Sequence, residues 1–195
     1  MKTFILSVPN TNLFPFTIRP INIGSVQQAN LIRQAVSEKV PVAIGFHMEG
    51  EAQSREVAGY GVPYIADMRL DGSLLMYVQG EGKVNISQST VISNGIITYN
   101  DVQVIEETYA LDENIKHQYV ALSKYFANWI DKYIVDPNQK DFFLKSLIGA
   151  KEVVAACGTY LVRDFEIQYE LMEKVNINDQ IDYLHRLMLS KQLIF

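Results

Sequence analysis

The sequence predicts an α+β protein with two lobes, a β-rich lobe over residues 1–107 and a helical lobe over residues 108–195. Up to about Glu107, prolines and glycines are frequent and apolar residues mostly alternate, as they do in short strands. After Glu107 the apolar period changes to 3.6 residues, which is typical of helices. With 195 residues, of which 48% are hydrophobic, the chain can bury a core without a disulfide or a structural metal.

Short strands joined by turns account for most of the first lobe. Pro15 and Pro20 place the strand at 14–23 on a sheet edge or at bends, because proline cannot donate to a ladder. Asp71-Gly72 predicts a hairpin turn, and Gly80-Glu81-Gly82 predicts a bend or bulge. One helix, Val26–Glu38, interrupts the strands, so we expect a closed or nearly closed barrel or a strongly bent sheet. The remaining strands are expected at residues 3–8, 40–48, from 57 onward, 74–78, 84–87 and 96–105.

Five helices are expected in the second lobe. Asp112 is a candidate N-cap for a long helix that ends before Asp136-Pro137-Asn138, where the next helix begins. That second helix carries an apolar face over residues 142–148 and stops at Gly149. Two more helices follow near residues 151–162 and 164–175, and Asn178 is expected to cap the last one.

Catalytic and metal-binding patterns are weak throughout the chain. The three histidines lie far apart, and none has a second His or Cys at the short spacing of a zinc site. The single cysteine, Cys157, lies in an apolar helix, where a buried structural thiol is favoured over a nucleophile. Gly80-Glu81-Gly82-Lys83 lacks the Ser or Thr and the helix of a phosphate-binding loop. We therefore expect no catalytic residue, no metal, no cofactor and no enzymatic activity.

Charge and hydropathy indicate which classes of partner and which cellular compartment to expect. The net charge is −5 and no basic run occurs, which argues against nucleic-acid binding. The apolar run at the N-terminus is broken by Pro9, too early for a secretory signal. No window is long enough for a membrane span, and one cysteine fits a reducing compartment. These observations predict a cytoplasmic protein with no membrane partner.

Exposed apolar residues are the best candidates for a binding surface. Leu13, Phe14 and Phe16 lie on the proline-broken edge segment, and Tyr60 lies between two glycines that leave its ring uncovered. We expect these four residues to contact substrate, and the alternative is that at least half of the side chains in the edge segment pack in the core. The polar loop at residues 49–56 is a second region where exposed side chains are expected.

The order of short motifs resembles the N-terminal, substrate-binding domain of the ATP-dependent protease Lon. The resemblance rests on the order of short segments and spans nearly the whole chain. The segments are Leu13-Phe14-Pro15, Pro20 before an Ile-x-Ile pair, Val42-Ala43-Ile44-Gly45-Phe46, Gly59-Tyr60-Gly61-Val62, the Leu70-Asp71-Gly72 hairpin, Lys83-Val84-Asn85-Ile86, Gln168-x-x-Leu171-Met172-Glu173 and Ile181-x-x-Leu184-x-x-Leu187.

Several positions depart from the family pattern. Phe16 stands where a glycine usually follows Leu-Phe-Pro, and Lys83 replaces the arginine that closes the hairpin. Asn176 replaces the usual aspartate before the last helix, and Gly24-Ser25-Val26 replaces an aromatic-Glu-Pro-Arg-Tyr stretch. The chain therefore resembles a divergent member, whose partner surface differs from that of typical Lon proteins.

The resemblance implies a β lobe in the form of a PUA-like pseudobarrel, followed by a helical bundle. It also implies a stand-alone substrate-recognition module, because the 195 residues contain neither a nucleotide loop nor the nucleophile segment of the Ser-Lys peptidase. Expected partners are unfolded or partly folded polypeptide segments, bound through apolar surface and sheet-edge pairing, and an ATPase-protease. The isolated protein is expected to be a monomer or a weak homodimer. The alternatives are a PUA-like RNA-binding module and, less favoured, a hydrolase.

Overall fold

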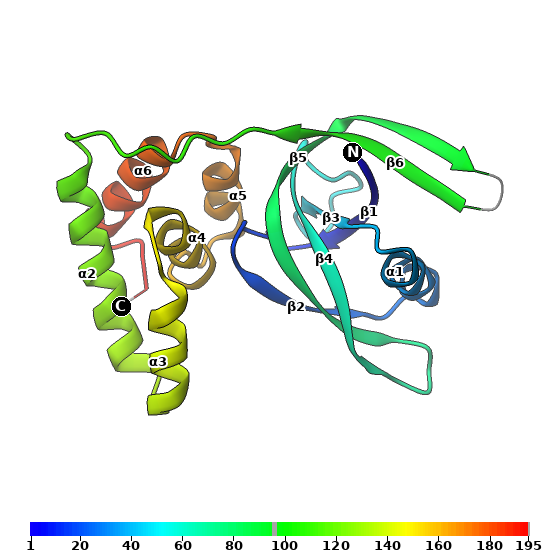
Figure 1. Cartoon of the computed structure of the whole chain (residues 1–195), viewed down its shortest axis with the longest axis horizontal. Helices are drawn as coiled ribbons and strands as arrows, with labels where there is room; N and C mark the ends of the chain where they lie inside the picture. The colour runs from blue at the N-terminus through cyan, green and yellow to red at the C-terminus, as the bar shows by residue number, and fades with distance from the viewer. Residues whose placement is uncertain (95–96, 195) are drawn as a thin grey trace. The chain divides into compact units, whose positions relative to one another are not determined.

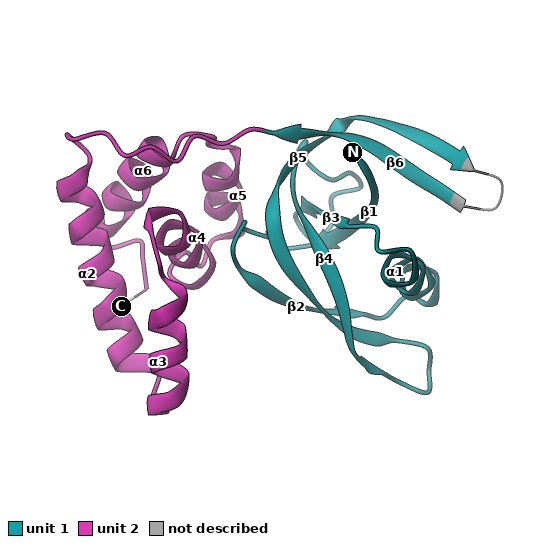
Figure 2. Cartoon of the chain, in the orientation of Figure 1, with its two compact units in different colours: residues 1–105 teal, residues 106–195 magenta. Residues whose placement is uncertain are grey.

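A computed structural model describes residues 1–94 and 97–194 of the chain. The chain divides into two compact units, Met1–Ile105 and Glu106–Phe195 (Figure 2). The first unit contains the sheet and one helix, and the second contains the other helices (Figure 1). The α+β class and the order of β lobe before helical lobe are thus confirmed.

Unit 1, Met1–Ile105, is a six-stranded sheet that closes on itself. The strands are β1 (Lys2–Pro9), β2 (Ile18–Ile23), β3 (Val42–His47), β4 (Val57–Met68), β5 (Leu74–Asn94) and β6 (Ile97–Ile105). Their order is β2-β5-β4-β3-β1-β6, and a further pairing of β5 with β6 closes the ring. β1 and β3 run parallel, and the other pairs are antiparallel. β2 lies outside this ring as an edge strand, as Pro20 predicts.

The core of unit 1 lies between the sheet and helix α1 (Val26–Glu38). Ala29, Ile32 and Ala35 of α1 pack in one cluster with Met76 and Val78 of β5. The helix begins at the residue that the sequence predicts, because the Ser25 hydroxyl accepts a hydrogen bond from the Gln28 N–H. α1 therefore covers the inner face of the sheet (Figure 1).

The segment before β2 is a turn, although the sequence predicts a strand over residues 14–23. Phe16 has a φ of 63°, in the left-handed region, so the extended chain is interrupted there. The Thr17 hydroxyl donates to the Phe14 carbonyl over 2.7 Å and holds the turn. The prediction was wrong at this point because β-type composition does not reveal a single left-handed residue.

β5 is one strand of 21 residues, where the sequence predicts two short strands at 74–78 and 84–87. The predicted bulge is confirmed: Tyr60 pairs with Gly82 and Gly61 with Gly80, so Glu81 has no residue opposite it. The bulge lets one strand pair with β2 and β4 in its first part and with β4 and β6 further on. Residue 96, the expected start of the last strand, lies outside the described residues.

Unit 2, Glu106–Phe195, is made of helices. They are α2 (Lys116–Tyr133), α3 (Pro137–Ser146), α4 (Ala150–Tyr160), α5 (Phe165–Glu173) and α6 (Ile177–Leu189). None of the helices in the described part of the chain is long and apolar enough to cross a membrane.

Three predicted helix signals have other roles in the structure. Asp112 does not cap α2, which begins at Lys116 without a side-chain cap. Asn176, not Asn178, caps α6, and the buried Asn178 amide donates to the Ala110 carbonyl over 2.9 Å. Gly149 precedes α4 as its N-cap residue instead of ending α3. Each error shifts a boundary by a few residues, because several residues near each helix start are competent caps.

Candidate functional site

An exposed, uncharged sheet face on β2, β5 and β4 is the candidate functional site. Its residues form two rows across the three strands, and all six are exposed. The first row is Ile18, Gln79 and Val62, and the second is Pro20, Tyr77 and Tyr64. We call these six residues the sheet face. Tyr64 is 68% exposed and Val62 is 53% exposed.

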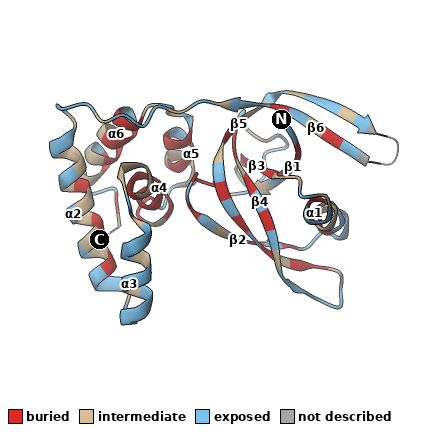
Figure 3. Cartoon of the chain, viewed as in Figure 1, coloured by how far each residue is buried: buried red, intermediate tan, exposed pale blue. Residues whose placement is uncertain are grey.

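Strand alternation places these side chains together. Successive residues of a strand point to opposite faces, so Val62 and Tyr64 share one face while Pro63 points to the other. Pro63 is buried, and so are Met76 and Val78 of β5. Figure 3 shows this alternation of buried and exposed residues along β4. The inner face therefore holds the core beneath α1, and the outer face carries exposed apolar side chains.

Two of the four residues expected to bind substrate border the sheet face. Tyr60 lies two positions before Val62 on β4 and is half-buried against Ala43, Ala58 and Val84. Burial, with a smaller contribution from the negative charge of Glu81, raises the pKa of Tyr60. The phenol is thus neutral in ordinary buffers.

Phe16 lies at the start of the sheet face and remains exposed. Its N–H donates to the Gly80 carbonyl over 2.8 Å, which fixes the turn against β5 two residues before Ile18. Its side chain is 36% exposed. Part of the Phe16 side chain is therefore exposed at this end of the face.

Leu13 and Phe14, the other two expected residues, lie in the core. Leu13 is fully buried and packs in the cluster beneath α1, and Phe14 is 4% exposed. The backbone of this segment presses against the sheet, since a Cβ built on Gly59 would lie 1.8 Å from the Leu13 carbonyl oxygen. Their side chains offer no surface to a partner in this structure. The apolar character that suggested binding serves packing instead.

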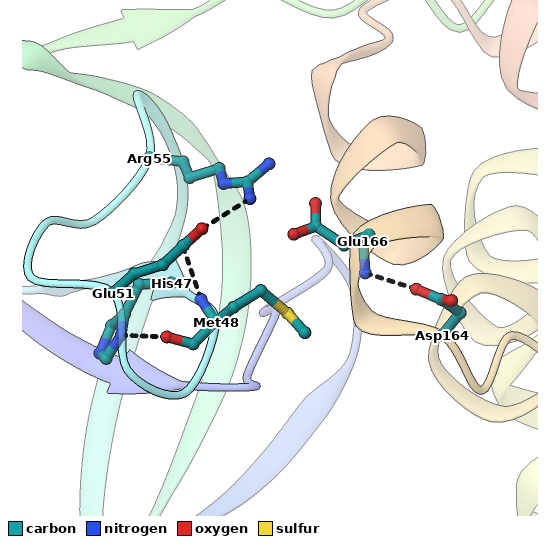
Figure 4. Close-up of polar contacts among 6 residues, drawn as sticks. All are labelled: His47, Met48, Glu51, Arg55, Asp164 and Glu166. Carbon is teal, nitrogen blue, oxygen red and sulfur yellow. Dashed lines mark hydrogen bonds and ion pairs between the residues drawn. The ribbon is translucent and has the colours of Figure 1, made fainter.

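The polar loop at residues 49–56 holds itself together (Figure 4). One oxygen of the Glu51 carboxylate accepts the Met48 N–H over 2.8 Å, and the other lies 3.2 Å from the Arg55 guanidinium. The Met48 hydrogen bond is the main cause that lowers the pKa of Glu51. The guanidinium also lies 5.6 Å from the centre of the Phe46 ring. These contacts hold the loop in its conformation.

The described residues contain no metal-binding cluster, and their single cysteine is buried. No group of three or more His, Cys, Asp or Glu side chains there is placed to hold a metal ion. Cys157 is fully buried in α4, and burial raises the pKa of its thiol, so the thiolate nucleophile is disfavoured. Asp164, which is drawn in Figure 4, caps α5 by accepting the Glu166 N–H over 2.8 Å.

Unit 2 carries a second apolar surface, around the end of α2 and along α3. Phe142 is 76% exposed, Val135 and Ile148 are still more exposed, and α3 has no buried residue. The sequence predicts that the helices at 119–133 and 142–148 pack mostly against each other and the β lobe. Within unit 2, Phe143 contacts the rings of Phe126 in α2 and Tyr160 in α4, and Leu144 and Leu147 line a small pocket with α2. This surface lacks the ordered rows and the main-chain groups of a sheet.

The apolar residues Val62 and Tyr64 contributed to the strand predicted from residue 57 onward, but no residue of the sheet face was predicted to bind substrate. In β4 both Pro63 and its neighbours Val62 and Tyr64 are apolar. A strand with apolar residues at both its even and its odd positions has two apolar faces. Either both faces are covered in the fold, or one of them remains exposed. The signal was therefore present, but the choice between the two outcomes required the sheet order.

Comparisons with known proteins identify the fold. No family model matches the sequence, and no curated protein matches it. Among solved structures, the N-terminal domain of the Mycobacterium avium complex Lon protease aligns with a TM-score of 0.72 at 17% identity, over 94% of this chain and 96% of that one. A Lon N-terminal domain protein from Xanthomonas campestris aligns with a TM-score of 0.64 at 14% identity, over 94% and 95%.

Proposed function

We propose that this chain, which has the fold of Lon N-terminal domains and a β unit that fits the PUA-like description, is a non-catalytic module. It binds unfolded or partly folded polypeptide segments. The observation that carries the proposal is the sheet face, six exposed residues without a formal charge on three adjacent strands. An exposed apolar patch of this kind is typical of a surface that binds another chain.

The chemistry of the sheet face favours an apolar polypeptide over RNA. Tyr64 and Tyr77 lie directly opposite each other in the register and offer two large rings with polar tips. No Lys or Arg belongs to the face, and the whole chain has a net charge of −5, so phosphates gain no attraction there. The RNA-binding alternative predicts salt-sensitive retardation of RNA, and we expect none.

A matched pair of valine variants tests the role of the sheet face. Val62 lies in the face, whereas Val91 is a 70% exposed valine further along β5. We expect Val62→Ser to weaken the binding of unfolded apolar peptides about fivefold, because a buried isopropyl contact is lost. Val91→Ser should leave the affinity unchanged. NMR titration or fluorescence anisotropy measures both affinities.

The absence of any peptide binding at high concentration would overturn the proposed function. Equal loss of affinity in Val62→Ser and Val91→Ser would place the binding surface elsewhere. A partner ATPase-protease, to which this module delivers segments, completes the proposal. Co-purification of the intact chain with such an enzyme tests this step. If no complex forms, the delivery role is wrong.

A further inference from the structure

The outer edge of β2 carries main-chain groups that no other strand in the described residues pairs with. β2 is the last strand in the sheet order and pairs only with β5 in the described part of the chain. The Gly80 N–H donates to the Thr17 carbonyl over 2.8 Å, and the register continues from that pair to Ile18 opposite Gln79. Antiparallel pairs alternate between bonded and non-bonded. Odd-numbered residues of β2 therefore bond to β5.

The even-numbered residues, Ile18, Pro20 and Asn22, consequently direct their main-chain groups away from β5. Pro20 fits this assignment, because a proline is tolerated only where no ladder bond is donated. We find no main-chain partner for Ile18 or Asn22 on the far side of β2 among the described residues. All three are exposed. The open edge thus offers the N–H groups of Ile18 and Asn22 and the carbonyls of all three.

We infer that the polypeptide binds as an added strand along the edge of β2. This inference rests on the proposed function. The uncharged side chains of the bound polypeptide extend the sheet face. The side chains of Ile18 and Pro20 belong to the sheet face, while their main-chain groups form the edge. A strand placed there pairs its backbone with β2 and lays alternate side chains beside the two rows. The outward N–H and carbonyl groups of β2 can pair with an extended backbone. The uncharged side chains of the sheet face can contact the apolar side chains of that strand.

The size of the sheet face distinguishes this occupant from a folded partner or a second copy of the chain. Strands lie about 4.8 Å apart and alternate residues about 6.8 Å apart, so six side chains cover on the order of 200 Å². A stable protein interface needs roughly 800 Å² on each partner. A single strand has no such requirement, because main-chain hydrogen bonds supply part of its affinity.

N-methylation of a peptide tests strand addition directly. The probe is a blocked peptide of alternating Val and Thr, about eight residues long, which favours an extended backbone. Binding to the intact chain is measured with a single N-methyl group moved along the peptide. We expect about fivefold weaker binding at every second position and no change in between, because only alternate N–H groups face β2.

A substitution at the edge of β2 should strengthen peptide binding, whereas N-methylation of the peptide weakens it. Pro20→Ala restores an outward N–H without removing a bond to β5, so we expect binding to tighten about threefold. Pro137→Ala, at the first position of α3, is the matched control and should change nothing.

The outcomes separate this inference from the proposed function. If the peptide binds but methylation shows no alternation, strand addition is wrong and the sheet face alone binds. If the unmodified peptide does not bind at all, the proposed function fails and this inference fails with it. A stable dimer that Val62→Ser dissociates would instead identify a second copy as the occupant and overturn the inference.

Discussion

Gly59 shows how a single residue lets a buried segment lie against the sheet. A Cβ at this position would lie 1.8 Å from the Leu13 carbonyl oxygen and 2.8 Å from its carbon. Both contacts are with backbone, which is bonded into the surrounding turn and cannot move aside cheaply. The absence of a side chain at Gly59 thus permits the burial of Leu13, which the sequence analysis expected at the surface.

Substitution of Gly59 should therefore be costly. We expect Gly59→Ala to lower the free energy of unfolding by about 3 kcal/mol, because the backbone of the Leu13 segment must shift. Gly24→Ala is the control, since a Cβ there meets nothing within 4 Å, and it should change stability by less than about 0.5 kcal/mol. Urea unfolding followed by circular dichroism measures both. Equal stability of the two variants would contradict the close approach.

Tyr99 provides a pH-dependent contribution to the stability of unit 1. Its hydroxyl donates to the Glu38 carboxylate at the end of α1, and its ring packs 5.2 Å from the ring of Phe4. The hydrogen bond to Glu38 is the largest cause that raises the pKa of Tyr99, followed by burial and the charge of Glu38. The folded protein therefore holds the phenol proton more tightly than the unfolded chain does.

A raised tyrosine pKa contributes stability below the unfolded value of about 10, and that contribution is lost as the pH rises through the folded pKa. Tyr99→Phe keeps the ring and removes the hydroxyl. We expect this variant to be less stable than the wild type at neutral pH, with the difference shrinking above about pH 10. Urea unfolding at several pH values tests this, and a difference that stays constant up to pH 11 would rule it out.

At the scale of elements, α3 contacts its neighbours through the Phe143 ring and through an ion pair between Lys140 and Asp131 at the end of α2. Phe143 lies 5.9 Å from the ring of Phe126 and 5.3 Å from that of Tyr160, in edge-to-face geometry. Its neighbour Phe142 is exposed, and α3 contributes no fully buried residue. Phe143 thus supplies the aromatic contacts of this element, although the ring is only partly buried.

The adjacent residues Phe142 and Phe143 provide a matched pair of substitutions for testing how α3 packs. We expect Phe143→Ala to destabilise the protein by about 2 kcal/mol, below the cost of a fully buried phenylalanine. Phe142→Ala should change stability by less than about 0.5 kcal/mol. The single tryptophan, Trp129, stacks on Phe126, so its emission should shift only in Phe143→Ala. Similar effects of the two substitutions would show that α3 packs through its other face.

At the scale of the whole molecule, each unit has its own buried residues. Unit 1 has the cluster beneath α1, and unit 2 buries Leu122, Phe126 and Ile130 of α2 together with most of α4. Each unit therefore has a packed interior of its own.

The limited size of the sheet face also predicts the assembly state. Because the face is well below the area of a stable interface, we expect a monomer in sedimentation velocity at micromolar concentration, with weak dimerisation only at higher concentration. A tight hexamer at micromolar concentration would show that the chain carries a larger assembly surface.

The sequence by itself determined the local elements of this protein. The bounds of α1, the bulge at Glu81 and the edge position of the strand with Pro20 all follow from backbone chemistry within a few residues. The order of short motifs was enough to predict the fold that the solved Lon N-terminal domains share.

Only the tertiary structure decided which side of each strand faces water. Val62 and Tyr64 alternate as core residues do, yet they lie on the outer face, while Leu13 and Phe14 are buried. Alternation defines two faces of a strand but does not say which one is covered. The position of α1 and the approach of the Leu13 segment to Gly59 settle that choice through contacts between residues far apart in the chain.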